Sequence, residues 1–208
     1  MNFSEKIESI TLKNINYDNL IKISIPTDMN CFFHSILRSF SETYIKSDNL
    51  TRLKITKNIR IKLSEHLEHI DKKTCLMIYD TLSNGTLREF SKNISEYSLD
   101  NMKNELKNNC PVDNAYVELA SNVFDIDIYI LNLTKGDIYL TGTDFNLYYK
   151  ERDSIFIGYT EPEGGNFVGH FEVIGLKSNG IIQTFFKNDH SFVKYIRNKY
   201  KKFFSDKN

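Results

Sequence analysis

A cysteine, a histidine and a glutamate in two short stretches have the side chains that nucleophilic catalysis uses. Cys31 stands in PTDMNCFFHSI, residues 26 to 36, and His170 and Glu172 stand in NFVGHFEVIG, residues 166 to 175. In such chemistry a thiolate attacks a carbonyl carbon, an imidazole moves the proton, and a carboxylate orients the imidazole. The three residue types are therefore candidates for a nucleophile, its base and the group that orients the base, provided that the fold brings the two stretches together.

Cys31 is predicted to be the first residue of a helix. Apolar residues follow it at the spacing of one helical face, namely Phe33, Ile36, Leu37 and Phe40. At about 100° per residue, Cys31 lies roughly 160° from Phe33, so we expect its thiol to face away from this stripe. The unpaired N–H groups and the dipole at a helix N-terminus stabilise a thiolate and lower the pKa of a cysteine. This position therefore favours a reactive thiol.

Two other roles for Cys31 stay open from the sequence. Free cysteine is among the most often buried residue types, so a packing role is the simplest alternative. Cys31 and His34 also form a Cys-x-x-His pair that would supply half of a zinc site. The sequence has no second close-spaced pair, because His66 and His69 lie in the polar run SEHLEH and are expected to be solvated. We therefore expect no metal, and we read His34 as structural or as a contact on the substrate side.

His170 is the histidine best placed to act as the base. Its stretch alternates as a strand does, with His170, Glu172 and Ile174 on one face and Phe171 and Val173 on the other. Residues i and i+2 of a strand lie about 6 to 7 Å apart, so the carboxylate of Glu172 can reach the imidazole and stabilise its charged form. A structural histidine on a sheet face is the alternative.

The elements that would position these residues have the order of an α+β fold, with helices first and a sheet later. Besides the helix at Cys31, helical patterns cover residues 51–70, 74–106 and 113–122, with a break at Asn84-Gly85. Strands are predicted at 125–133, 137–142, 154–159, 166–175 and 180–186, and Lys135-Gly136 is expected to turn a hairpin. A last helix is expected from about Ser191.

Composition narrows the class of protein. The chain has 208 residues, which suits one domain, with 27 basic and 27 acidic residues in balance. A neutral chain has no overall field to hold a polyanion, so we expect no nucleic-acid partner. We see neither a signal peptide nor an apolar run of membrane-spanning length, so we expect no membrane partner. The cysteines are three, Cys31, Cys75 and Cys110, which indicates free thiols in a reducing cytoplasm.

Two stretches together resemble the ovarian tumour (OTU) family of cysteine proteases. TDMNCFFHSI resembles the family's Asp-Gly-Asn-Cys-Phe-aromatic segment, and GHFEVI resembles its C-terminal His-aromatic-acid strand. Between them, DNAYVELASNVFDIDIYIL resembles the family's acidic helix and the apolar strand that follows it. His170 stands about 140 residues after Cys31, a spacing that also suits the family. The similarity covers most of residues 18 to 175.

The resemblance implies a papain-like fold, with a mostly antiparallel sheet between helical layers, and a deubiquitinase activity. Such an enzyme cleaves the isopeptide bond at the C-terminal glycine of ubiquitin or a ubiquitin-like modifier, without a cofactor. By position, Cys31 would be the nucleophile, His170 the base and Glu172 the third member of a triad. Asp28 would begin the catalytic motif, and backbone N–H groups of residues 28 to 31, which include Met29 and Asn30, would form the oxyanion hole.

Two departures from the family's pattern keep other functions open. Met29 stands where the family usually has glycine, which would strain the loop if that position requires a positive φ. Glu172 replaces the commoner Asp or Asn and is one methylene longer. The alternatives are an inactive pseudoenzyme that binds the modifier, and a papain-like protease or acyltransferase with other substrates. Compactness and FFHSI suggest a viral or effector member, which would act as a monomer in the host cytoplasm.

The loop before the His170 strand and the C-terminal segment also have predicted roles. The loop TEPEGGN, residues 160 to 166, precedes the His170 strand and is expected to border the channel for the modifier's tail. Gly164 and Gly165 would allow close backbone approach, and Glu161 or Glu163 would meet a basic tail residue. The core is expected at about 18–186, followed by a helical extension at about 191–208 that packs its aromatic residues and solvates its lysines.

Overall fold

The computed structural model describes residues 3–72, 75–84, 97–110, 114–140, 150–162 and 169–206. The described strands form one mixed sheet in the order β1-β2-β6-β5-β3-β4, with β7 paired to β6 and β8 paired to β5. Strands β3 and β5 run parallel, and the other pairs are antiparallel. The strands are β1 (Ile7–Ser9), β2 (Leu20–Ile23), β3 (Asp127–Asn132), β4 (Asp137–Tyr139), β5 (Ser154–Thr160), β6 (His170–Ser178), β7 (Ile181–Gln183) and β8 (Phe185–Phe186).

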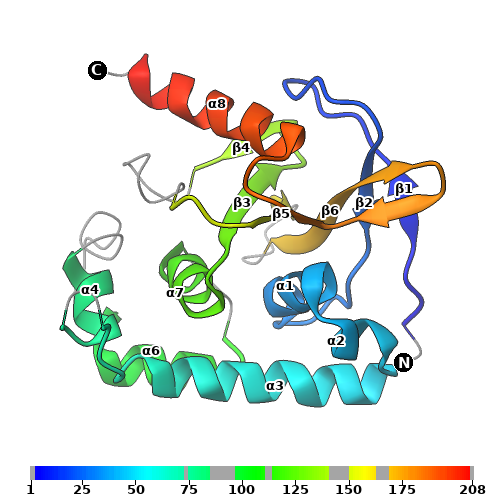
Figure 1. The fold of residues 1–208 in the computed structure, drawn as a ribbon. Coiled ribbons are helices and arrows are strands. Elements are labelled where there is room, and N and C mark those ends of the chain that lie inside the picture. Colours follow the sequence, from blue (N-terminus) through cyan, green and yellow to red (C-terminus); the bar gives the residue numbers. More distant parts are fainter. Residues whose placement is uncertain are drawn as a thin grey trace.

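Helices cover both faces of this sheet, most of them on one face and α8 on the other (Figure 1). The larger layer surrounds α1, which packs on β6 and β5. The helices are α1 (Cys31–Phe40), α2 (Glu42–Lys46), α3 (Asn49–His66), α4 (Ile78–Asn84), α6 (Leu99–Lys107), α7 (Asn114–Phe124) and α8 (Ser191–Ser205). The expected α+β class, with a mostly antiparallel sheet between helical layers, is confirmed.

Alternation along the strands divides the apolar core into two parts. On the α1 side, Ile128, Ile155 and Ile157 pack against residues of α1, α3, α6 and α7. On the α8 side, Tyr129 and Phe156 pack against residues of α8, so neighbouring residues of one strand serve opposite cores. Strand β3 is buried along its whole length because both faces are covered.

The structure corrects several expectations about the elements. Strands β1 and β2 were not predicted, although they complete the sheet beside β6. The core therefore extends beyond 18–186 at both ends, because β1 pairs in the sheet and α8 covers one of its faces. The helix expected at 51–70 ends at His66, and Ile70 beyond its end is 60% exposed. The hairpin at Lys135-Gly136 is confirmed, with Gly136 at φ +68°.

Candidate active site

Cys31 is the first residue of α1, as predicted, but its thiol is buried. The side of α1 opposite the apolar stripe packs on the sheet, where Cys31 lies among Ile21, Ile23 and Val173 and is 5% exposed. Burial raises the pKa of the Cys31 thiol, while backbone N–H groups act in the opposite direction. The expectation of a lowered pKa at the helix N-terminus is therefore wrong, because burial outweighs the nearby N–H groups.

The thiol of Cys31 lies beside the start of β6. Phe171, the residue after His170, packs against the apolar cluster that contains Cys31, and its backbone N–H acts to lower the pKa of the thiol, against the effect of burial. The Phe171 ring packs edge-on against Phe32, the residue after Cys31, with centroids 5.3 Å apart. The fold thus brings together two stretches that are far apart in the sequence.

His170 opens β6, where it is paired with Thr160 of β5 and is partly buried. Burial lowers the pKa of the His170 imidazole; Glu172 and Asp28 oppose this effect, and the charge of Lys22 adds to it. The imidazole is therefore neutral near pH 7, which is the form that a general base requires.

Glu172 follows on the same strand and is 6% exposed. Its carboxylate forms an ion pair with Lys22 of β2, with Nζ and Oε2 3.1 Å apart. Among the described residues, Glu172 makes no hydrogen bond with the His170 ring. The carboxylate is near the imidazole in the sheet, as its alternation predicts, but its direct partner is a lysine that the sequence analysis did not identify.

The loop before Cys31 is held by its own side chains. Asp28 accepts a hydrogen bond from the Asn30 N–H at 2.8 Å, and its carbonyl accepts from the Cys31 N–H at 3.2 Å. The Asp28 N–H donates to the Pro26 carbonyl. Of the four N–H groups expected to form the oxyanion hole, only that of Met29 has no hydrogen bond to the described part of the chain.

Met29 itself carries no backbone strain. It is not among the described residues with positive φ, and its side chain is 48% exposed. Asn30 is the N-cap of α1 and is 4% exposed, and its buried Oδ1 has no hydrogen-bond partner within the described ranges. The loop therefore accommodates a side chain where the resembling family has glycine.

His34 is a structural residue of this site. The sequence analysis did not identify its partners. Its buried ring lies 2.6 Å from the Tyr44 hydroxyl and 3.1 Å from Thr56 Oγ1 through Nδ1, and 3.3 Å from Asp28 Oδ2 through Nε2. Burial acts to raise the pKa of Asp28, but the hydrogen bond and charge of His34 and the Asn30 N–H outweigh it, so this pKa lies below its usual range. Because both ring nitrogens are occupied, His34 does not form the zinc half-site that its spacing allowed.

Arg60 of α3 was also missed, because a buried arginine has no sequence signature. Its side chain is 1% exposed, and its guanidinium donates to the carbonyls of Leu106, Glu105 and Cys110 at 2.7 to 2.9 Å. A longer contact of 3.4 Å reaches the Met29 carbonyl. Arg60 thus joins the loop before Cys31 to the end of α6.

A cleft of about 790 Å³ opens beside these residues. The N-terminal segment forms one wall, and the Glu5 carboxylate anchors it through hydrogen bonds of 3.0 Å from Arg38 and Arg52. The lining residues from the predicted site are Asp28, His170 and Glu172, together with His34. The cleft thus reaches His170, Glu172 and the loop before Cys31, while Cys31 itself is not among its lining residues.

The loop expected to border a tail channel is described only in part. Glu163, Gly164 and Gly165 lie outside the described residues. Glu161 accepts a hydrogen bond from Asn132 at 2.9 Å and pairs with Lys135 at 2.7 Å, so its carboxylate already has two partners from the β3–β4 hairpin. A contact between Glu161 and a substrate stays a prediction.

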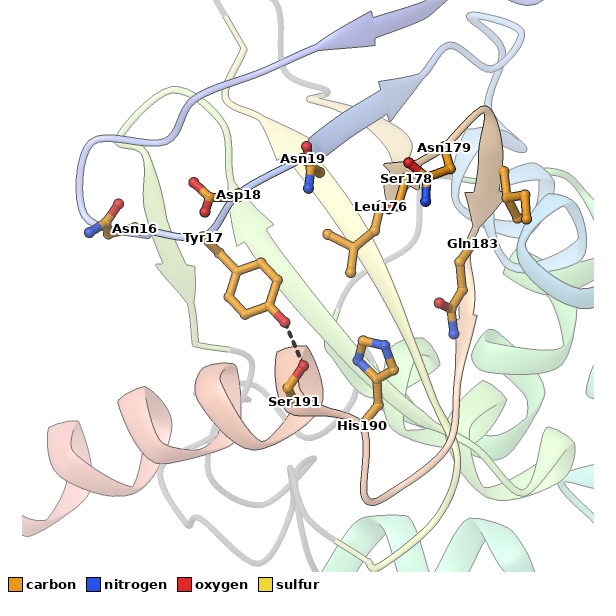
Figure 2. A pocket seen from close by; sticks show the side chains of 11 residues that line it. Asn16, Tyr17, Asp18, Asn19, Leu176, Ser178, Asn179, Gln183, His190 and Ser191 are labelled. Atoms are coloured by element: carbon orange, nitrogen blue, oxygen red, sulfur yellow. Dashed lines mark hydrogen bonds between the residues drawn. The ribbon is translucent and has the colours of Figure 1, made fainter.

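A second hollow, of about 730 Å³, lies beside the first turn of α8 (Figure 2). Its polar lining includes Tyr17, whose hydroxyl is 2.7 Å from Ser191 Oγ. His190 cannot activate this serine through Nδ1, because that atom accepts a hydrogen bond from the Phe192 N–H. The hollow contains none of the predicted catalytic residues, so the cleft at His170 is the candidate active site.

The described residues also bear on metal binding, membrane spanning and disulfide formation. Among the described residues, no group of three or more His, Cys, Asp and Glu side chains is arranged to hold a metal ion. No helix in those ranges is long and apolar enough to span a membrane. The described cysteines are free.

Comparison with solved structures identifies the fold. The structure matches one described as an OTU domain in complex with ubiquitin, with a TM-score of 0.51 and 14% sequence identity over 90% of this chain and 86% of the other. No family model and no curated protein matches the sequence. The chain therefore has an OTU-like fold, as its two motifs suggested.

Proposed function

We propose that this protein is a cysteine-dependent isopeptidase that cleaves ubiquitin, or a ubiquitin-like modifier, from a lysine side chain. The observation that carries the proposal is that Phe171, the residue after His170, packs against the apolar cluster that contains Cys31 and acts on its thiol through the backbone N–H, so the start of β6 lies beside the candidate nucleophile. The OTU-like fold supports the substrate class, because the matched OTU domain is in complex with ubiquitin.

The reaction begins from an uncharged pair. The thiol keeps its proton because burial raises its pKa, and the imidazole is neutral because burial lowers its own. As the sulfur attacks the carbonyl carbon of the terminal glycine, its proton passes to His170. The carbonyl oxygen becomes negatively charged, and the free N–H of Met29 is available to stabilise it.

The intermediate then collapses to a thioester on Cys31. The carbon–nitrogen bond breaks, and His170 returns its proton to the departing lysine amine. Water, deprotonated by His170, hydrolyses the thioester and regenerates the thiol. A glycine at the end of the modifier suits a nucleophile that is only 5% exposed, because glycine has no side chain to obstruct the approach.

The test is hydrolysis of a ubiquitin C-terminal fluorogenic amide, with ubiquitin-like modifiers assayed in parallel. We expect Cys31→Ala and His170→Asn to abolish turnover, and Glu172→Gln to lower kcat by about 10-fold to 100-fold. Cys75→Ser is the matched control and should leave turnover unchanged, because Cys75 is exposed and is not among the residues that line the cleft. Turnover that persists in Cys31→Ala would contradict the proposal.

Binding without cleavage is the second candidate function. Two observations favour it, namely the pairing of Glu172 with Lys22 rather than His170 and the raised pKa of the thiol. This alternative predicts that wild type and Cys31→Ala bind ubiquitin equally well while neither hydrolyses the amide. Calorimetry with free ubiquitin, run beside the hydrolysis assay, separates the two functions.

A further inference from the structure

Lys22 occupies a position in the sheet from which it reaches two carboxylates. It lies on β2 opposite Ile174 of β6, so its side chain shares a face with Glu172, two residues earlier on β6. On the other side it lies directly opposite Glu8 of β1. The Lys22 ammonium is 3.1 Å from Glu172 and 3.5 Å from Glu8.

The two acids differ in their exposure to water. The Glu172 side chain is 8% exposed and that of Glu8 is 57% exposed. A buried carboxylate loses much of its hydration and therefore depends on its ionic partner. Lys22 is consequently the ionic partner of the buried Glu172 carboxylate, and it binds the group that would otherwise be free to turn to His170.

We propose that Lys22 is a positioning residue that controls how strongly Glu172 supports His170. In the resting protein the Glu172 carboxylate is bound to Lys22. When His170 takes the proton from Cys31, the imidazolium competes for this carboxylate, and Glu8 remains as the second partner of Lys22. The catalytic consequence rests on the proposed function, whereas the coupling of Lys22 to His170 does not.

Other charged groups also act on His170 and must stay constant in a test. Glu172 lies on the same strand, Lys22 on β2, and Asp28 in the loop before α1. The cleft that contains the imidazole is also lined by Lys6, His34 and Arg52. Lys22 is therefore the position at which a charge can be removed without altering the residues assigned to catalysis.

The direct test is a titration of His170 by NMR, with the signal assigned from a His170→Asn variant. We expect Lys22→Met to raise the pKa of His170 by about half a unit to one unit, because a like charge is removed and Glu172 is released. Lys22→Arg keeps the charge and the pairing, so it should leave this pKa unchanged. An unchanged pKa in Lys22→Met would overturn the proposal.

A double-mutant cycle separates positioning from simple charge repulsion. In a Glu172→Gln background, Lys22→Met removes only the repulsion, so the rise in the pKa of His170 should be smaller than in the wild-type background. Equal rises would mean that Lys22 does not position Glu172. If Lys22→Met fails to fold, Glu8→Gln is the substitute variant. It removes the second partner of Lys22, so Lys22 should pair more fully with Glu172 and the pKa of His170 should fall. A rise or no change in this pKa would overturn the proposal.

Kinetics then link the coupling to the reaction. The acid limb of kcat/KM should move to higher pH in Lys22→Met by the same amount as the pKa measured by NMR, and Lys22→Arg should follow the wild type. A pKa shift without any Cys31-dependent hydrolysis would reject the proposed function and leave the coupling intact. Hydrolysis with no shift in either measurement would reject the coupling alone.

Discussion

The protonation state of Cys31 depends on two opposing effects of its position. The helix dipole and nearby N–H groups stabilise a thiolate by about 0.3 to 2 kcal/mol. Burial of a charged group shifts a pKa by up to 3 to 5 units, or about 4 to 7 kcal/mol. Because Cys31 is 5% exposed, burial prevails and its pKa is raised. Under the proposed mechanism, His170 must therefore remove the proton as the sulfur attacks.

This account predicts how Cys31 responds to an alkylating reagent. The pH profile of Cys31 alkylation by iodoacetamide, followed by peptide mass mapping, should give an apparent pKa above that of an ordinary cysteine. The exposed Cys75 in the same sample is the internal control for the reagent and should be alkylated faster than Cys31, because it is accessible. An apparent pKa near 4, as in preformed thiolate–imidazolium pairs, would contradict the account.

The loop residue Met29 gives a second prediction at this scale. Because Met29 does not have a positive φ, the geometry of the loop does not require glycine. Met29→Gly should lower the free energy of unfolding by about 0.5 to 1 kcal/mol, through the entropy of the unfolded chain, and change kcat/KM by less than about twofold. A large gain in kcat/KM, measured with the fluorogenic amide, would show that the methionine distorts the site.

From the sequence, candidate residues for the site could be proposed, but not their partners in the fold. Cys31, His170 and Glu172 have recognisable types and local patterns, whereas the link from Lys22 to Glu172 depends on the pairing of β2 with β6. That pairing joins segments about 150 residues apart, and no local periodicity records it. The packing of α1 on the sheet could not be predicted for the same reason. This packing buries Cys31 and raises the pKa of its thiol, where the sequence analysis expected a lowered pKa.

At the scale of elements, long and strongly patterned segments were predicted best. The helix from Cys31, the helix in 51–70, the β3–β4 hairpin and β5 all appear at or near their expected bounds. The short strands β1 and β2 were missed because three or four residues give too little alternation, and the charge of Lys22 interrupts the apolar run in β2.

Arg60 connects three elements, and its loss should destabilise all of them. Arg60→Met keeps the volume of the side chain but leaves the carbonyls at the end of α6 without their donors, so the free energy of unfolding should fall by about 3 kcal/mol or more. Lys57→Met, at an exposed position of the same helix, should change it by less than about 0.5 kcal/mol. Equal stabilities in urea titrations would contradict this role.

At the scale of the whole molecule, α1, whose first residue is Cys31, and α8 cover opposite faces of the sheet (Figure 1). The helix is part of the second core rather than an appended extension, since Phe192, Ile196 and Tyr200 are fully buried. The Tyr200 hydroxyl lies 2.8 Å from the carbonyl oxygens of Ile130 and Tyr139. Stability of the fold can therefore be changed from the α8 side without altering the cleft.

Tyr200→Phe tests this separation of stability from chemistry. Loss of the buried hydroxyl should lower the free energy of unfolding by about 1 to 2 kcal/mol, measured by urea titration, because it removes the donor to two carbonyls. The value of kcat/KM should stay within about twofold of wild type at 25 °C. A tenfold fall in kcat/KM in the fully folded variant would show that the two faces are coupled.

The central claim is that Cys31 attacks the C-terminal carbonyl of ubiquitin with the help of His170. The most direct measurement is the intact mass of the protein after incubation with ubiquitin that carries a C-terminal electrophile. The account predicts one added ubiquitin in the wild type, none in Cys31→Ala, and adduct formation slowed by about 100-fold or more in His170→Asn. Failure of the folded wild type to form the adduct, or an adduct that persists in Cys31→Ala, would contradict it.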